Sequence, residues 1–108
     1  MEINEYAQFV LGRRIPPAQV QVPAEVFITV CGLVGELGEV LEHLKKHVRD
    51  GKELHESALK KEMGDVLFYW CRMCDHLGLN PASVIEANIA KLTDRAQRGV
   101  ERGSGDDR

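Results

Sequence analysis

Two long apolar stripes at helical spacing, separated by a short break around Gly51, constrain the fold of this chain more than any other feature. At about 100° per residue, the members of each stripe share one face of a helix. A break of a few residues brings two such helices back against each other in antiparallel order. The sequence therefore predicts an all-α protein built on a helical hairpin. The stripes are Val26, Val30, Leu33, Leu37, Val40, Leu41 and Leu44, and then Leu59, Met63, Val66, Leu67, Trp70 and Met73.

Each stripe is bordered by two carboxylates three residues apart, Glu36 and Glu39 on the first and Glu62 and Asp65 on the second. Residues at this spacing lie on the same side of a helix. We expect the four acids to converge at a partly buried seam of the hairpin. Clustered carboxylates repel one another unless a divalent cation lies between them, and hard oxygen ligands suit Mg²⁺ or Mn²⁺. The pattern predicts a metal site for phosphate chemistry.

The spacing of the acids is weak support by itself, because it recurs at Glu2/Glu5, Glu39/Glu42 and Glu53/Glu56. The position of both acid pairs beside an apolar stripe supports a shared site better than their spacing does. The alternative is that both pairs are solvated acidic helix edges. His43 and His47 share the face of the first pair. No zinc-binding H-E-x-x-H signature is present, and we expect these histidines to be exposed or supporting.

Composition limits the class of protein. The chain has 108 residues, 44% hydrophobic and 29% charged, which fits one globular domain. A net charge of −3 does not indicate the basic surface with which proteins bind nucleic acid. No apolar run approaches the ~20 residues of a membrane span, and no signal-peptide core begins the chain. Three cysteines, an odd number, favour a reducing cytoplasmic location, with the thiols filling the core or its edge.

The remaining segments are two shorter helices, a linker and a tail. Residues 2–12 have helical apolar spacing, and a polar linker runs to Pro23. The long helices are expected at about 24–48 and 54–77. Asn80 and Pro81 then supply an N-cap and a first-turn proline for a fourth helix. The glycines among the first acids, Gly32, Gly35 and Gly38, predict that something approaches this helix closely.

The fourth helix carries Asn88, Lys91 and Arg95 on one flank. An amide and two cations beside a carboxylate–metal cluster would suit a polyphosphate, although a solvated basic edge is the alternative. Residues 98–108 have the composition of a disordered tail, but their Gly-Ser-Gly run between arginines could also wrap a phosphate with backbone N–H groups.

Three blocks of the sequence resemble the MazG-like all-α nucleoside triphosphate pyrophosphohydrolases. Their order and spacing agree with that family and cover most of residues 25–98. One departure is Gly35, where many members have an additional glutamate. The blocks are Gly32-Leu-Val-Gly-Glu-Leu-Gly-Glu-Val40, Lys61-Glu-Met-Gly-Asp-Val-Leu-Phe-Tyr-Trp70 and Asn88-Ile-Ala-Lys-Leu-Thr-Asp-Arg95.

The resemblance implies hydrolysis of a nucleoside triphosphate, NTP or dNTP, to a monophosphate and pyrophosphate, an activity compatible with nucleotide-pool house-cleaning. Mg²⁺ (with Mn²⁺ as a substitute) would be bound by Glu36, Glu39, Glu62 and Asp65, which form the catalytic set. Asn88, Lys91, Arg95, Arg98 and Arg108 would bind substrate.

The resemblance also implies a four-helix domain over residues 1–97, completed by a homodimer or tetramer. The tail, 98–108, would close over the nucleotide, because its ending resembles that of compact bacterial and phage members. Two alternatives stay open: a non-catalytic helical interaction module, and a metal hydrolase acting on another phosphorylated nucleotide.

Overall fold

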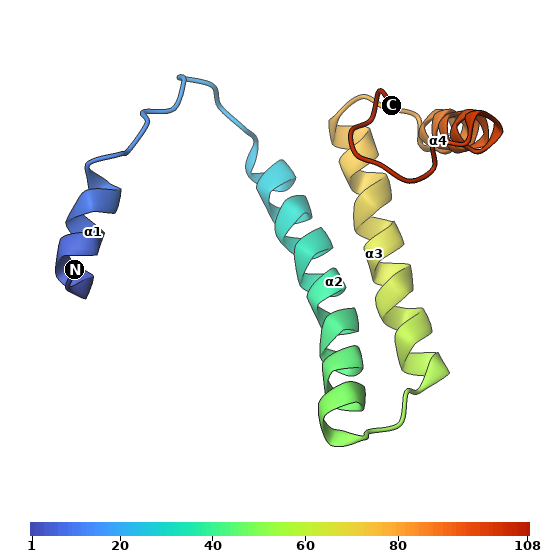
Figure 1. Cartoon of the computed structure of the whole chain (residues 1–108), viewed down its shortest axis with the longest axis horizontal. Helices are drawn as coiled ribbons and strands as arrows, with labels where there is room; N and C mark the ends of the chain where they lie inside the picture. Colours follow the sequence, from blue (N-terminus) through green and yellow to red (C-terminus); the bar gives the residue numbers. More distant parts are fainter.

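The computed structural model describes residues 1–108 and contains four helices without a strand, which confirms the all-α prediction (Figure 1). None of the helices combines the length and apolarity needed to cross a membrane. The helices are α1 (Ile3–Leu11), α2 (Ala24–Asp50), α3 (Glu56–His76) and α4 (Pro81–Arg98).

Helices α2 and α3 lie side by side as an antiparallel hairpin (Figure 1). The turn depends on Gly51, whose φ of 67° is in the left-handed region that favours glycine. Its backbone N–H donates to the carbonyl of His47 at 3.1 Å. The ring of His47 reaches across the turn, with Nδ1 2.7 Å from the carbonyl oxygen of Lys52. This histidine therefore fastens the hairpin turn.

Two close contacts join the helices of the hairpin. The ring of Tyr69 lies against Gly32, where an added Cβ atom would be 2.6 Å from Cδ1 of the tyrosine and would overlap the ring. Nearer the open end, Thr29 is almost fully buried and donates its hydroxyl hydrogen to the carbonyl of Glu25 at 2.8 Å. Its oxygen can then only accept from Nε2 of His76, at 2.9 Å. The close approach predicted from the glycines is thus present at Gly32, while Gly35 and Gly38 face open space.

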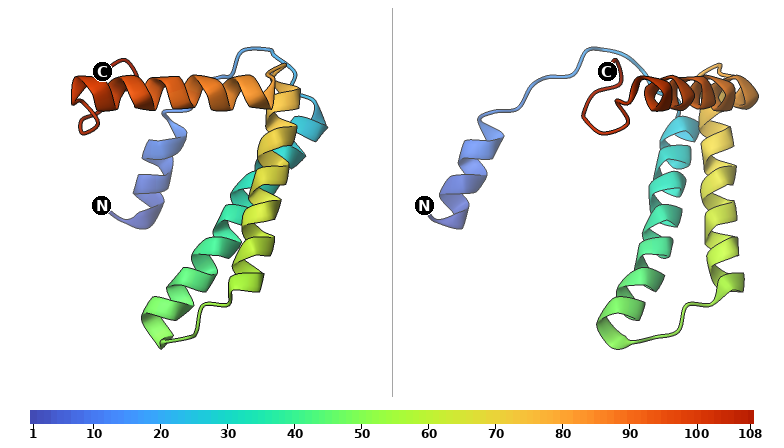
Figure 2. Two further views of the ribbon diagram at one scale, coloured as in Figure 1. Left: turned by 90° about the vertical axis from the view of Figure 1, so that its right-hand side faces the viewer. Right: turned by 45° about the vertical axis from the view of Figure 1, so that its right-hand side comes forward.

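Helix α4 runs at a steep angle to the hairpin and extends away from its open end (Figure 2). It starts as predicted, since the side chain of Asn80 accepts a hydrogen bond from the Ser83 backbone and Pro81 is the first helical residue. Both are features that favour a helix start. Gly99 ends the helix, with φ of 68°. Contacts with the hairpin come from α3 alone, so α4 projects as an arm.

Helix α1 contacts none of the other helices, and residues 12–23 hold it away from them (Figures 1 and 2). The radius of gyration is 19.7 Å. A compact chain of this length would have about 13 Å. Only Thr29, Cys74 and Arg95 are buried. The expectation that all three cysteines fill the core or its edge holds for Cys74, which is buried, but not for Cys31 and Cys71, which are exposed because no second layer covers the hairpin. Such an extended shape is consistent with a fold completed by oligomerisation.

Candidate active site

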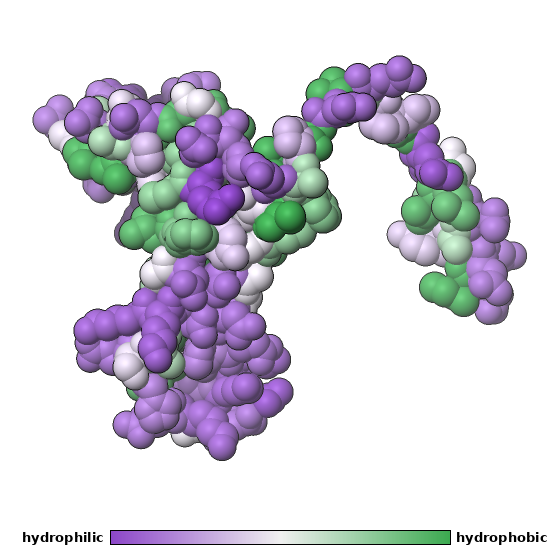
Figure 3. All heavy atoms as spheres, turned by 180° about the vertical axis from the view of Figure 1, so that it is seen from behind, coloured by the Kyte–Doolittle hydropathy of each residue, from purple (hydrophilic) through white to green (hydrophobic).

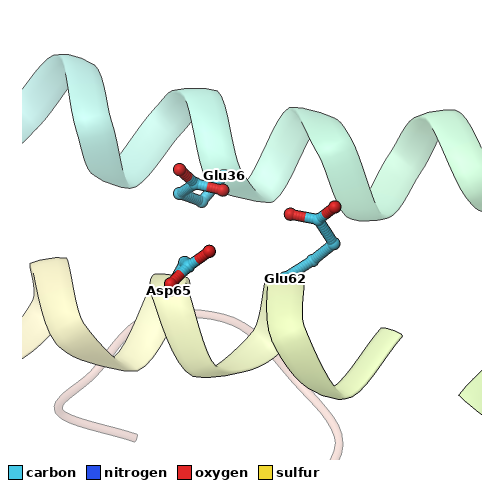
Figure 4. Close-up of side chains that lie close together, drawn as sticks. All are labelled: Glu36, Glu62 and Asp65. Carbon is cyan, nitrogen blue, oxygen red and sulfur yellow. The ribbon is translucent and has the colours of Figure 1, made fainter. Parts of the chain in front are cut away.

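Three of the predicted acids meet between the helices of the hairpin. Glu36 extends from α2 toward Glu62 and Asp65 on α3, and one carboxylate oxygen from each lies within 4.8 Å of the others (Figure 4). The helical spacing of Glu62 and Asp65 places both on the side of α3 that faces Glu36. Partial burial, together with the charges of Asp65 and Glu62, raises the pKa of the Glu36 carboxyl above its usual value, because both effects oppose ionisation. The cluster therefore concentrates negative charge at one point of the seam.

The donor set of this cluster fits a divalent cation. Direct ligands of Mg²⁺ lie about 2.1 Å from the ion, so two opposite ligands are about 4.2 Å apart. The three acids approach this separation without any change of backbone. All three donors are hard carboxylate oxygens, which favours Mg²⁺ or Mn²⁺ over zinc. Glu36, Glu62 and Asp65 are thus a candidate metal site.

Glu39, the fourth predicted acid, is exposed and is outside this cluster. Three residues of α-helix turn a side chain by about 300°, so it lies nearly one turn along and about 60° around from Glu36. Its charge still contributes to the raised pKa of Glu36. The structure therefore separates the four acids into a cluster of three and a free neighbour.

His43 lies beside the cluster, with Nε2 3.6 Å from a carboxylate oxygen of Glu62. It follows Glu36 by seven residues, which returns it to the same face of α2. This contact agrees with the supporting position expected for it from the sequence. A histidine here can orient the Glu62 carboxylate.

The two cations predicted on α4 are engaged by the tail. Nζ of Lys91 donates to the Asp106 carboxylate at 3.1 Å, and the guanidinium of Arg95 donates to the Asp106 carbonyl at 2.6 Å. The hydrogen bond from Lys91, followed by the charge of Lys91 and the contact with Arg95, holds the pKa of Asp106 below its usual range. Arg95 is almost fully buried, and its Nε has no hydrogen-bond partner. A carboxylate thus lies where the sequence predicts that the cations meet phosphate.

The tail folds back on the end of α4 through hydrogen bonds of its arginines. Arg98 donates to the carbonyl of Arg108 at 2.7 Å. Arg108 in turn donates to the carbonyls of Gly105, Glu101 and Val100, at 2.6, 3.1 and 3.2 Å. Each guanidinium has several N–H donors. Two arginines can therefore satisfy the backbone carbonyls of a loop that forms no helix or sheet. Arg98 and Arg108 therefore hold the tail in its conformation by donating hydrogen bonds to backbone carbonyls of the tail itself.

Asn88 shares a shallow cavity of about 240 Å³ with Val84, Ala87 and Lys91 on α4. This cavity is lined by α4 alone. The clustered acids belong to α2 and α3, while α4 projects from the open end of the hairpin (Figure 2). The acidic and basic halves of the predicted site are therefore not assembled by one copy of the chain.

A helical hairpin with a carboxylate cluster at its seam, followed by a basic helix, defines a small all-α domain with a candidate divalent-cation site. The MazG nucleotide pyrophosphohydrolase domain family matches residues 28–100, which include the whole cluster and α4. The chain belongs to this family. It is also 38% identical over 81 residues to the Gene 37 protein of Mycobacterium phage L5, with 71% of each chain covered. No solved structure matches the chain.

Proposed function

We propose that this protein hydrolyses nucleoside triphosphates to the nucleoside monophosphate and pyrophosphate in a reaction that requires Mg²⁺. Membership of a nucleotide pyrophosphohydrolase family supports the general activity. The observation that carries the proposal is the cluster of Glu36, Glu62 and Asp65, because three carboxylates at this separation suit a cation that binds phosphate.

When bound, Mg²⁺ would neutralise phosphate oxygens and make water a better nucleophile. Glu36, Glu62 and Asp65 would hold the ion, and His43 would keep Glu62 in position. Glu39 is the acid left outside the cluster, so its carboxylate is free to accept the proton of the attacking water. This division gives each of the four predicted acids a role.

Lys91 and Arg95 would stabilise the negative charge that develops on the leaving pyrophosphate. Because α4 projects away from the acids of its own chain, a second copy would supply these cations, in a homodimer or a tetramer. Asn88 would bind next to them, and the tail with Arg98 and Arg108 would close over the nucleotide. Substrate phosphate would replace the Asp106 carboxylate at Lys91.

The products identify the reaction. Incubation with each NTP and dNTP in Mg²⁺, beside a panel of nucleoside diphosphates and alarmones, is followed by chromatography, and the triphosphates should give the monophosphate and pyrophosphate. Hydrolysis of a different phosphorylated nucleotide in preference to all triphosphates would favour the alternative metal hydrolase. Release of the diphosphate and orthophosphate would show that the wrong bond is assigned, and no turnover would favour the non-catalytic module.

Replacing Lys91 by alanine should reduce kcat/KM by about tenfold or more. A charge-assisted contact contributes about 1.5–3 kcal/mol, and about 1.4 kcal/mol corresponds to a factor of ten. Steady-state kinetics on both proteins would measure this effect. Lys60→Ala is the matched control, since Lys60 is exposed and pairs only with Glu56 on the same helix. Equal kinetics for Lys91→Ala and wild type would leave Lys91 with only its contact to Asp106 and no role in binding substrate.

A further inference from the structure

Helix α1 presents an apolar face that nothing in its own chain covers. Ile3, Tyr6, Ala7, Val10 and Leu11 recur at helical spacing on this face. Ile3 is 75% exposed, and Tyr6 and Leu11 are 53% and 52% exposed. A helix of nine residues is too short to be stable in water without tertiary packing. The helix therefore needs a partner surface of about its own length.

A groove along α3 has matching dimensions. It has a volume of about 750 Å³, and its apolar floor is Leu67, Phe68 and Cys71. Gly64 is at one end of it and Asp75 at the other. At about 1.5 Å per residue, this stretch of α3 is about 16 Å long, while α1 spans about 13 Å. Figure 3 shows apolar surface both on the upper part of the hairpin and on the detached α1.

The charges of the two surfaces are complementary in one orientation. Arg13 and Arg14 follow the C-terminal end of α1. The upper end of the groove is lined by Glu25 and Asp75 together with Arg72 and His76, so its two carboxylates outnumber its one arginine. Glu2 and Glu5 are at the opposite end of α1, and Lys61 lies three residues before Gly64 at the lower end of the groove. When α1 lies parallel to α3, opposite charges meet at both ends.

We propose that α1 of one copy docks in the α3 groove of a second copy, so that two chains exchange their N-terminal helices. The linker favours this exchange over docking in the same chain. Pro16, Pro17 and Pro23 stiffen residues 12–23 in an extended form, which directs α1 away from its own hairpin (Figure 1). A second copy would also cover exposed residues of α2 such as Val34 and Leu41, which a single short helix cannot reach.

A cysteine pair tests the proposed docking position of α1 directly, because Cys71 is exposed and lines the groove. Parallel docking places Ala7, in the middle of the apolar face of α1, opposite this thiol. We expect Ala7→Cys to form a disulfide with Cys71 of a second copy under mild oxidation. The product should run as a covalent dimer in a denaturing, non-reducing gel, and peptide mass spectrometry should identify the linked cysteines.

Two variants complete the experiment. Gln8→Cys places the thiol on the polar face of the same helix and should give little covalent dimer. Ala7→Cys combined with Cys71→Ser should lose the dimer, although Cys31 and Cys74 are still present. A disulfide to Cys71 within one chain would overturn the exchange in favour of docking in the same chain. A failure of Ala7→Cys to link with Cys71, or equal linking by Ala7→Cys and Gln8→Cys, would overturn the proposed docking position of α1.

Discussion

Glu36→Gln and Asp65→Asn should each reduce triphosphate hydrolysis about a hundredfold or more and remove the stabilisation of the protein by Mg²⁺. A ligand that binds only the folded state raises the melting temperature by mass action. Loss of one charged oxygen from a cluster of three weakens the cation site. Loss of preorganised charge stabilisation typically costs about 10²–10³ in rate. Thermal melts with and without Mg²⁺, with kinetics in parallel, would measure both effects.

Glu42→Gln is the matched control for the acid variants. Glu42 is on the same helix as Glu36 but pairs with Lys45 and is not in the cluster. It should retain both the Mg²⁺ response and the activity. All three variants should keep the helical circular dichroism of the wild type. An unchanged Mg²⁺-induced shift in both Glu36→Gln and Asp65→Asn would contradict the metal assignment.

The hairpin could be predicted because its determinants are local. Apolar residues at helical spacing defined the faces of α2 and α3. Gly51 marked the turn, where α2 continues to Asp50. The same periodicity placed Glu36, Glu62 and Asp65 beside the apolar seam. These three acids required only two helices in antiparallel contact to come together.

The arrangement of α1, α4 and the tail depends on interactions between distant segments, and the sequence pattern did not specify it. Helical periodicity predicts which face of α4 carries Lys91, but it does not predict where that helix points. The direction of α4 is set at its junction with α3, so the pattern could not show whether Lys91 reaches the acids. Composition alone favours disorder in the tail, because it does not register that a buried arginine such as Arg95 can bind the carbonyl oxygens of Gly105 and Asp106.

Gly32→Ala should destabilise the protein by about 2 kcal/mol, the middle of the range for overpacking a tight contact. This loss is expected even though alanine is the better helix former. The added methyl group would lie 2.6 Å from Cδ1 of Tyr69 and overlap the ring, so either the ring or the helix must move. In a small domain the expected loss corresponds to a fall of about 10 °C in melting temperature. Thermal and urea unfolding would measure it.

Gly35→Ala provides the opposite expectation at a matched site. Nothing lies within 4 Å of the added atom in one chain. The helix-propensity gain of about 1 kcal/mol should therefore appear as increased stability. In a Tyr69→Leu background the penalty of Gly32→Ala should largely disappear, because the ring that opposes the methyl group is gone. If Gly32→Ala instead stabilised the wild-type chain, as Gly35→Ala should, then Tyr69 does not pack on Gly32 and the hairpin contact is misassigned.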